Sequence, residues 1–143
     1  MRALLDVNVL IALLDSRHIH HGLATRWLAD HGELGWASCP ITQNGCIRIF
    51  SQPGYPNTVS ADQVAQRLAE ASAHPWHTFW PDSISLLQLG CLQWDQVLSS
   101  RHLTDVYLLA LAVHMGGRFV TLDRGIPLQA VDKASPDNLV ILT

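Results

Sequence analysis

The stretch Met1-Arg2-Ala3-Leu4-Leu5-Asp6-Val7-Asn8 opens the chain and decides its fold. Its apolar residues 3–5 are enough for a short buried strand, and the residues from Val7 to Leu14 favour a helix. Asp6 stands where the strand hands over to the helix. In a parallel sheet this point lies at the carboxyl edge, where open α/β folds bind their ligands. Asp6 is therefore either a plain N-cap or a candidate for chemistry, and its partners must decide between the two.

The composition indicates a single globular domain spanning residues 1–143. Of these residues 48% are hydrophobic and only 15% are charged, which excludes a disordered chain. The formal net charge is −3, so no global basic field attracts nucleic acid. An RNA or DNA partner therefore requires a local mechanism, such as a metal ion that bridges carboxylates to a phosphate.

The cysteines and the apolar runs bear on the cellular compartment. Cys39, Cys46 and Cys91 are odd in number and lack CxxC spacing, so they favour buried thiols in a reducing compartment. Asp6 interrupts the N-terminal apolar run, no cleavage pattern follows, and no run reaches membrane-spanning length. We expect a soluble, cytoplasmic protein without a membrane partner.

Apolar periodicity alternates between strand and helix along the chain. We expect strands at 3–5, 34–38, 76–80, 118–122 and 139–142, and helices at 7–14, 20–31, 41–50, 61–72, 85–89 and 105–115. Strands that alternate with helices in this way predict an α/β fold. Its architecture is a three-layer α/β/α sandwich around a central, mostly parallel sheet of four to five strands.

Three aspartates occupy comparable positions. Asp6 and Asp123 each end a predicted strand, and Asp105 opens the apolar helix that leads into the strand before Asp123. Strand ends and the starts of the following crossover helices share one sheet edge, so the three carboxylates are expected to converge. Converging carboxylates repel one another unless a cation sits between them, and oxygen ligands select Mg²⁺ or Mn²⁺. Such an ion can activate water against a phosphodiester.

Two polar residues flank these acids, and each has a structural alternative. Asn8 follows Asp6 by two residues and Thr121 precedes Asp123 by two, so either can hydrogen-bond a carboxylate or a bound water. Asn8 is equally explained as a capping residue, and Thr121 as an ordinary alternating strand residue. Asp105 can also be a simple first-turn acid that favours the helix dipole.

At this point the motifs match a known family. They are Leu4-Leu5-Asp6-Val7-Asn8, Cys39-Pro40-Ile41-Thr42-Gln43-Asn44-Gly45, Thr104-Asp105-Val106-Tyr107-Leu108-Leu109-Ala110, and Gly117-Arg118-Phe119-Val120-Thr121-Leu122-Asp123-Arg124-Gly125. With them the chain resembles the PIN-domain ribonucleases, particularly the VapC toxins of toxin–antitoxin pairs, over essentially its whole length. The resemblance implies endonucleolytic cleavage of RNA that depends on Mg²⁺ or Mn²⁺, with the metal held by Asp6, Asp105 and Asp123. It also implies a homodimer and inhibition by a small VapB-like antitoxin.

The chain departs from this family at one position. Gln43 stands in the first turn of the middle helix, where the family usually has Glu. An amide keeps an oxygen ligand but loses a charge, so we expect Gln43 to orient the attacking water rather than to bind the metal. The same departure favours an alternative function, a weak or inactive PIN-like module that binds RNA or a protein.

A third hypothesis is a phosphotransfer fold in which Asp6 accepts a phosphoryl group. The only lysine of the chain is Lys133, and none lies near the last strand, which argues against this hypothesis.

Overall fold

The computed structural model describes residues 1–88 and 90–143. Its centre is a five-stranded sheet with the order β3-β2-β1-β4-β5, in which every neighbouring pair is parallel. The strands are β1 (Ala3–Leu5), β2 (Trp36–Ser38), β3 (His77–Phe79), β4 (Arg118–Thr121) and β5 (Leu139–Ile141). The first strand is the middle one, and Leu4 pairs with Ala37 on one side and Phe119 on the other. The predicted parallel sheet is confirmed.

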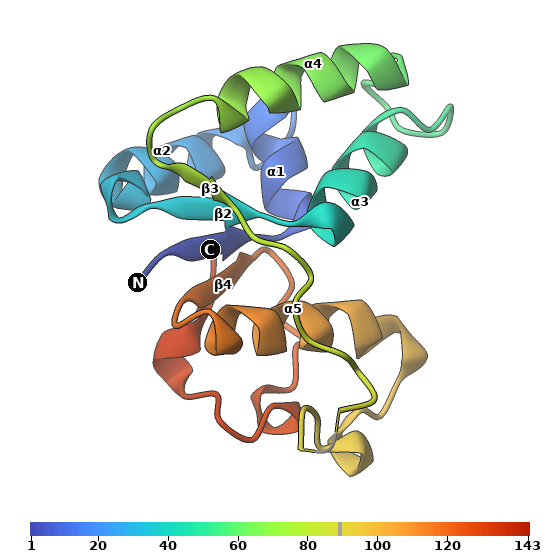
Figure 1. The fold of residues 1–143 in the computed structure, drawn as a ribbon. Coiled ribbons are helices and arrows are strands. Elements are labelled where there is room, and N and C mark those ends of the chain that lie inside the picture. The colour runs from blue at the N-terminus through green and yellow to red at the C-terminus, as the bar shows by residue number, and fades with distance from the viewer. Residues whose placement is uncertain (89) are drawn as a thin grey trace.

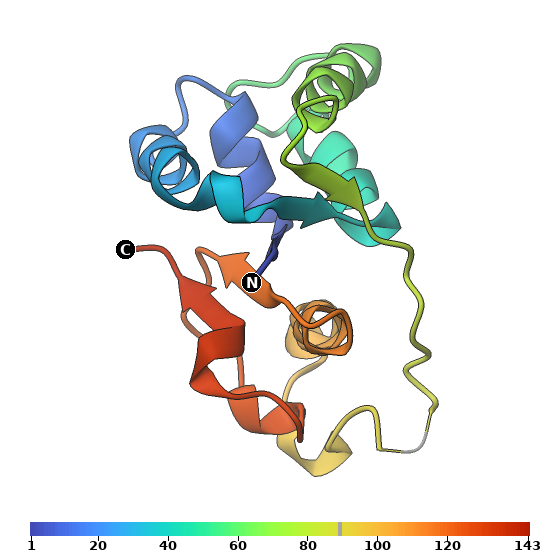
Figure 2. The ribbon, with the colours of Figure 1, turned by 60° about the vertical axis from the view of Figure 1, so that its left-hand side comes forward.

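Helices cover both faces of the sheet. They are α1 (Val7–Leu14), α2 (His21–His31), α3 (Pro40–Phe50), α4 (Ala61–Ser72) and α5 (Leu103–His114). Figures 1 and 2 show α1 to α4 gathered on one side of the sheet, while α5 and the C-terminal segment lie on the other. The hydrophobic core is divided in the same way, into one cluster around α1 and another around α5. The three-layer α/β/α sandwich is therefore confirmed.

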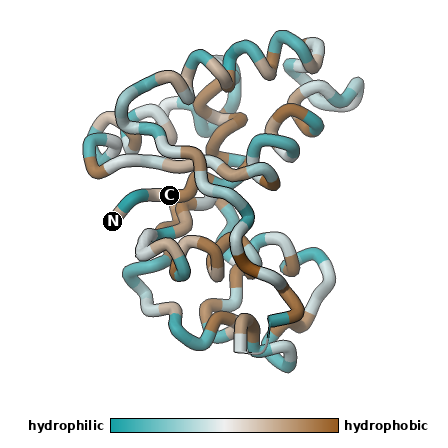
Figure 3. The backbone as a smooth tube through the Cα atoms, in the orientation of Figure 1, coloured by the Kyte–Doolittle hydropathy of each residue, from teal (hydrophilic) through white to brown (hydrophobic). Residues whose placement is uncertain are grey.

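The burial of each helix follows its composition. Seven consecutive residues of α5, from Val106 to Ala112, are buried, as its nearly continuous apolar sequence predicts. In α4 only Val64 and Leu68, four residues apart, are buried. Figure 3 shows the contrast, since much of α5 is brown and most of α4 is hydrophilic or neutral. None of the helices described is both long and apolar enough to span a bilayer.

The helix expected at 85–89 was a wrong prediction for its first four residues. Residues 85–88 form a bend and turns, and residue 89 lies outside the described residues. Leu87 is 90% exposed, so no apolar face is buried to stabilise a short helix here. The Ser85 hydroxyl instead accepts the N–H of Leu87 at 3.1 Å, a local bond that competes with helix formation. Short 3-10 turns fill much of the remaining connections, at Gly32–Leu34, Trp94–Gln96, Ser100–His102, Leu128–Ala130 and Pro136–Asn138.

The loop between α3 and α4 is anchored by Asp15 at the end of α1. This side chain is only 4% exposed, and its Oδ2 accepts the Tyr55 hydroxyl at 2.5 Å and the Asn57 amide at 2.9 Å. Burial raises the pKa of Asp15, but the bonds from Tyr55, Asn57 and the Arg17 backbone outweigh burial and lower it overall. The loop is thus held by a buried, ionised carboxylate.

We expect Tyr55→Phe to reduce the free energy of unfolding by about 2 kcal/mol, because a buried charged acceptor loses a donor. Tyr107→Phe is the matched control, since the Tyr107 hydroxyl donates to the neutral carbonyl of Ile84 at 2.9 Å. That loss should be about 1 kcal/mol. Urea denaturation at neutral pH measures both. Equal losses in the two variants would show that Asp15 does not anchor the loop.

Candidate active site

Asp6 directly follows β1 and is the N-cap residue of α1. Its backbone is extended, with φ −63° and ψ 159°, and its Oδ1 accepts the N–H of Val7 at 2.7 Å. Its Oδ2 accepts the Thr121 hydroxyl at 2.6 Å, and the side chain is only 5% exposed. The capping role considered for Asp6 is therefore real, and a second bond ties the same carboxylate to β4.

Thr121 connects the ends of the two central strands. Besides donating to Asp6, its Oγ1 accepts the backbone N–H of Asp123 at 3.0 Å and lies 3.4 Å from the amide nitrogen of Asn8. Asn8 in turn accepts the N–H of Leu122 at 3.2 Å. Thr121 thus hydrogen-bonds a carboxylate, whereas Asn8 contacts the Thr121 hydroxyl and the Leu122 backbone, and the supporting roles of both residues in the chemistry stay predictions.

Asp105 lies in the first turn of α5, near the other two acids. Burial raises its pKa to about 7, assisted by the charges of Asp6 and Asp123 and by a hydrogen bond with the Asp123 side chain. Burial also raises the pKa of Asp6, against the bonds from Thr121 and Val7 and with a further contribution from Asp123. The predicted convergence is therefore observed, because Asp6 and Asp123 both act on the ionisation of Asp105, and Asp123 also acts on that of Asp6.

A divalent ion of this kind needs several oxygen donors arranged around one point. Across residues 1–88 and 90–143, no three His, Cys, Asp or Glu side chains are already arranged so that they could hold a metal ion. The donor chemistry nevertheless fits a hard cation, since all three side chains present oxygen. In the absence of a cation, a proton on Asp105 relieves the repulsion, and a cation could replace that proton.

A cleft of about 560 Å³ opens beside these acids, between α1, α3 and α5. Its lining residues are Asp6, Val7, Pro40, Ile41, Asn44, Gly45, Arg48, Ile49, Asp82, Thr104 and Asp105. Gly45 allows α3 to approach α1, because a Cβ at this position would lie 2.6 Å from a methyl group of Val7. Asp123 does not line the cleft. Its charge acts on the two acids that do, Asp105 and Asp6.

Gln43 does not line the cleft. Its Nε2 donates to the Ser38 hydroxyl at 3.0 Å, and that hydroxyl lies 2.8 Å from Nε2 of His77. Asn44, one residue further along α3, is the residue that faces the cleft. The structure therefore brings together Asp6, Asp105, Asp123, Asn8 and Thr121, and it turns Gln43 toward β2 and β3.

Sequence reasoning missed three residues that line the cleft: Asn44, Arg48 and Asp82. All three had a usable signal. Asn44 and Arg48 are four residues apart and share one face of α3. Asp82 follows the β3 strand by three residues, so its strand-end position was also visible.

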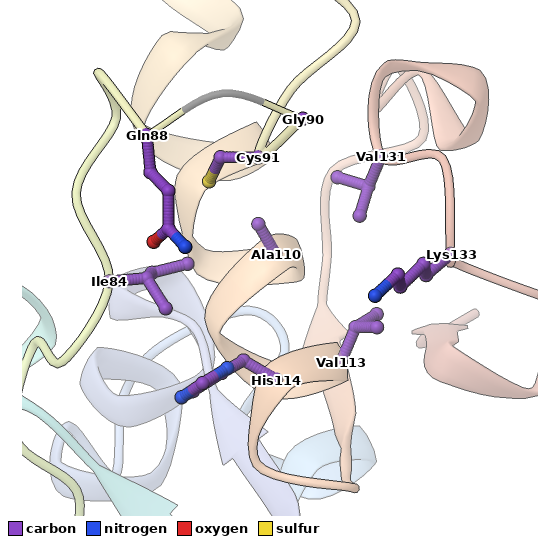
Figure 4. Close-up of a pocket in the computed structure, with 9 residues that line it drawn as sticks. All are labelled: Ile84, Gln88, Gly90, Cys91, Ala110, Val113, His114, Val131 and Lys133. Carbon is purple, nitrogen blue, oxygen red and sulfur yellow. The ribbon is translucent and has the colours of Figure 1, made fainter.

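A second hollow of about 330 Å³ lies along α5, beside the segment that follows β3 (Figure 4). Ala110 and Val113 of α5 line it, together with Lys133 and His114, and none of its described lining residues is acidic. The only lysine of the chain therefore lies away from the carboxylates, which leaves the phosphotransfer hypothesis without its cation.

Comparison with known proteins agrees with this geometry. Residues 3–133 match the PIN domain model. The chain is 47% identical over 142 residues to Ribonuclease VapC44 of Mycobacterium tuberculosis, covering 99% of this chain and all of that protein. It is 44% identical over 128 residues to Ribonuclease VapC39 of the same organism, covering 88% of this chain and 91% of that protein. The chain therefore belongs to the PIN-domain family, among the VapC ribonucleases.

Solved structures share the fold at low sequence identity. A VapBC2 chain from Rickettsia felis, solved bound to a DNA fragment from its promoter, matches with a TM-score of 0.66 and 11% identity over the whole of both chains. Mycobacterium tuberculosis VapC20, a Sarcin-Ricin loop cleaving toxin, matches with a TM-score of 0.59 and 12% identity, covering 81% of this chain and 85% of that one. The PIN-like fold is thus confirmed.

The raised pKa of Asp105 predicts how stability depends on pH when metal is chelated. The folded chain holds a proton up to about pH 7, whereas the unfolded chain releases it near its ordinary value of 3.8. The free energy of unfolding should therefore fall as pH rises through this window, by up to about 1.4 kcal/mol per pH unit, and level off above it. Asp105→Asn should remove this part of the slope.

Urea denaturation of the wild type and Asp105→Asn in chelator, across the same window, measures the difference. Part of the slope should remain in the variant, because the pKa of Asp6 is raised as well. Parallel pH profiles for the two proteins would contradict the assignment of the proton to Asp105.

Proposed function

We propose that this chain is an Mg²⁺- or Mn²⁺-dependent endoribonuclease that acts as the toxin of a toxin–antitoxin pair. The convergence of Asp6, Asp105 and Asp123 at one desolvated sheet edge carries the proposal, together with membership among the VapC ribonucleases. The net charge of −3 supports a metal-based mechanism, because the protein lacks a general basic field to attract RNA. A local cation gives the acidic cleft its means of holding a phosphate.

Asp6, Asp105 and Asp123 are the residues that would hold the ion, directly or through water. When bound, a divalent ion lowers the pKa of a coordinated water and stabilises charge on a phosphoryl group. The role of Thr121 is to keep Asp6 in place through its 2.6 Å bond. Asn8 keeps the turn before Asp123 in place by accepting the N–H of Leu122 at 3.2 Å. The water-orienting role expected of Gln43 stays a prediction. In this structure its amide nitrogen donates a hydrogen bond to the Ser38 hydroxyl.

The alternative of a non-catalytic binding module rests on Gln43 alone. An intact trio of interacting acids speaks against it, because a module that only binds RNA gains nothing from concentrating like charge in its cleft. The same trio is what metal-assisted hydrolysis requires.

The partners proposed for this chain are an RNA substrate, a VapB-like antitoxin and a second copy of the chain. The antitoxin is supported by the fold shared with the VapBC2 chain. We also propose that the protein acts in the cytoplasm, consistent with Cys39, Cys46 and Cys91, all of which are free thiols.

Cleavage of a pool of cellular RNAs with Mg²⁺, with Mn²⁺ or with chelator tests the proposed activity. We expect cleavage with either metal, none with chelator, and a loss of at least about a hundredfold in Asp6→Asn, because one of three acidic ligands loses its charge. Metal-independent binding of RNA without cleavage, unchanged in Asp6→Asn, would instead favour the binding module.

A homodimer is expected to use an apolar face of the N-terminal half that includes Trp27. This ring stacks on His31 with a centroid distance of 4.8 Å, and the Arg118 guanidinium lies 5.2 Å from the ring centroid. Ile19 and Leu34, in the same half of the chain, are 88% and 56% exposed. Sedimentation at micromolar concentration should show a dimer, and a monomer there would remove this proposal.

A further inference from the structure

Arg48 brings a positive charge into the acidic cleft. Among the described residues that line the cleft, it is the only one with a cationic side chain. Asn44 lies one turn earlier on the same face of α3, and both residues are exposed. The acids of the lining come from other elements, Asp6 from the end of β1 and Asp105 from α5. The cleft therefore has its positive charge on the wall formed by α3.

The guanidinium of Arg48 is not engaged by the protein itself. Other arginines are used to hold the fold. Arg2 donates to two backbone carbonyls, at 2.7 and 3.1 Å, and the Arg118 guanidinium lies 5.2 Å from the centre of the Trp27 ring. Within the described residues, the Arg48 side chain donates no hydrogen bond, and outside the helix bonds only its backbone carbonyl is engaged, by the Ser51 hydroxyl at 3.4 Å. An exposed guanidinium whose donors are all free is available to a ligand.

Arg48 also leaves the acids of the cleft uncompensated. The pKa of Asp105 is raised by burial and by the charges of Asp6 and Asp123, and that of Asp6 by burial and by Asp123. A guanidinium close to either carboxyl would lower its pKa, yet Arg48 is not among the groups that act on them. The positive and negative charges of the cleft are therefore far enough apart to meet different parts of one ligand.

The position of Arg48 along α3 places it beside the acids, not among them. This helix begins at Pro40, two residues after the end of β2, and Arg48 lies about 12 Å further along its axis. At Gly45 the helix packs against Val7, the residue that follows Asp6. Arg48 is about 4.5 Å along the axis beyond this crossing, so it faces the part of the cleft next to Asp6.

A strand of phosphates is the ligand that matches both walls. The acids hold a phosphate only through a cation, whereas a guanidinium binds a phosphate directly, through two parallel N–H···O bonds. RNA carries a phosphate on each side of every ribose, so one strand presents a reacting phosphate and a neighbouring phosphate together. In a chain of net charge −3, a single well-placed arginine is a local means of attracting the neighbouring phosphate.

We propose that Arg48 binds an RNA phosphate next to the one that is cleaved, and thereby positions the strand in the cleft. Arg48 is then a substrate-binding residue that takes no part in breaking the bond. This inference rests on the proposed function, because it assumes that RNA is the substrate of the cleft beside Asp6 and Asp105.

The salt dependence of RNA binding tests the inference without reference to cleavage. A fluorescent oligouridylate is titrated with Asp6→Asn protein in chelator, so that no strand is cut. Each phosphate contact to a single strand contributes about −0.7 to the slope of log affinity against log salt concentration. Adding Arg48→Ala to this protein should make the slope shallower by about 0.7 and weaken binding several-fold at low salt.

Three further variants separate this contact from general effects of charge and from the face of α3. Arg48→Lys keeps the charge and should retain the slope, while it loses the bidentate bonds and part of the affinity. Arg17→Ala removes the same charge from an exposed position beyond the far end of α1, outside the cleft, and should leave the slope unchanged. Asn44→Ala alters the same face of α3 without a change of charge and should also leave the slope unchanged.

Steady-state cleavage of the same probe with Mg²⁺ places the contact relative to the reacting phosphate. In the otherwise native chain, Arg48→Ala should raise KM several-fold and leave kcat within about twofold, because a contact to a neighbouring phosphate is the same before and during the reaction. A large fall in kcat at unchanged KM would place Arg48 on the reacting phosphate and overturn the proposed position.

The failure of this inference and the failure of the proposed function give different results. If the wild type cleaves RNA with metal while Arg48→Ala changes neither the slope nor KM, Arg48 binds no phosphate and the inference is overturned. Equal loss of slope in Arg17→Ala, or no binding of the probe to the Asp6→Asn protein at any salt concentration, overturns it as well. If the wild type cleaves no RNA with Mg²⁺ or Mn²⁺, the proposed function falls, and a loss of slope in Arg48→Ala would then support the binding module.

Discussion

Repulsion between carboxylates at one buried sheet edge is the constraint that the rest of this structure must satisfy. Asp6 is almost fully buried, and burial together with the charges of Asp6 and Asp123 raises the pKa of Asp105 to about 7. The chain offsets this repulsion locally, with the Thr121 hydroxyl and the Val7 N–H on Asp6 and a hydrogen bond between the side chains of Asp105 and Asp123. A protein selected for stability alone would place apolar or amide groups here, so the arrangement is better explained by a ligand that carries positive charge.

The parallel sheet determines where this constraint falls. Because β1 is the central strand and is buried along its whole length, its backbone has no freedom to move Asp6 away from the edge. Leu5 pairs with Val120, so the next residue of each strand is placed side by side, and Thr121 meets Asp6 without any long-range adjustment. The same register brings the start of the buried helix α5 to this edge, since that helix leads into β4. The positions of the three aspartates, the burial of Asp6 and the repulsion between the carboxylates thus all follow from the topology of the parallel sheet.

The main elements and the three acids were predictable from the sequence because both depend on short-range patterns. The bounds of α1 and α4 match the predicted ranges, since apolar spacing and the residues before each helix define them. Asp6, Asp105 and Asp123 followed from topology alone, because any parallel sheet collects strand ends at one edge.

What escaped prediction depends on side-chain direction and on tertiary contacts. The prediction that Gln43 lies in the first turn of α3 was correct. Consecutive residues of a helix point about 100° apart, so Gln43 and Asn44 face different directions. Only the packing of α3 on α1 decides which of the two faces the cleft. Gly45 sets that packing, and a glycine next to a valine of another helix has no signature in the sequence. Asp82 precedes the helix predicted at residues 85–89, of which residues 85–88 form only a bend and turns, so only its place after β3 pointed to the sheet edge.

The two roles considered for Asp6, helix cap and metal ligand, are compatible in this geometry. An ionised carboxylate offers about four lone-pair sites, two on each oxygen. The Val7 N–H occupies one site on Oδ1, and the Thr121 hydroxyl occupies one on Oδ2. One site on each oxygen therefore remains for a cation, so metal binding need not break the cap or release β4. The bonds that hold Asp6 in place favour its ionised form, but burial outweighs them and raises its pKa overall, so a cation would supply the remaining stabilisation of the charged carboxylate.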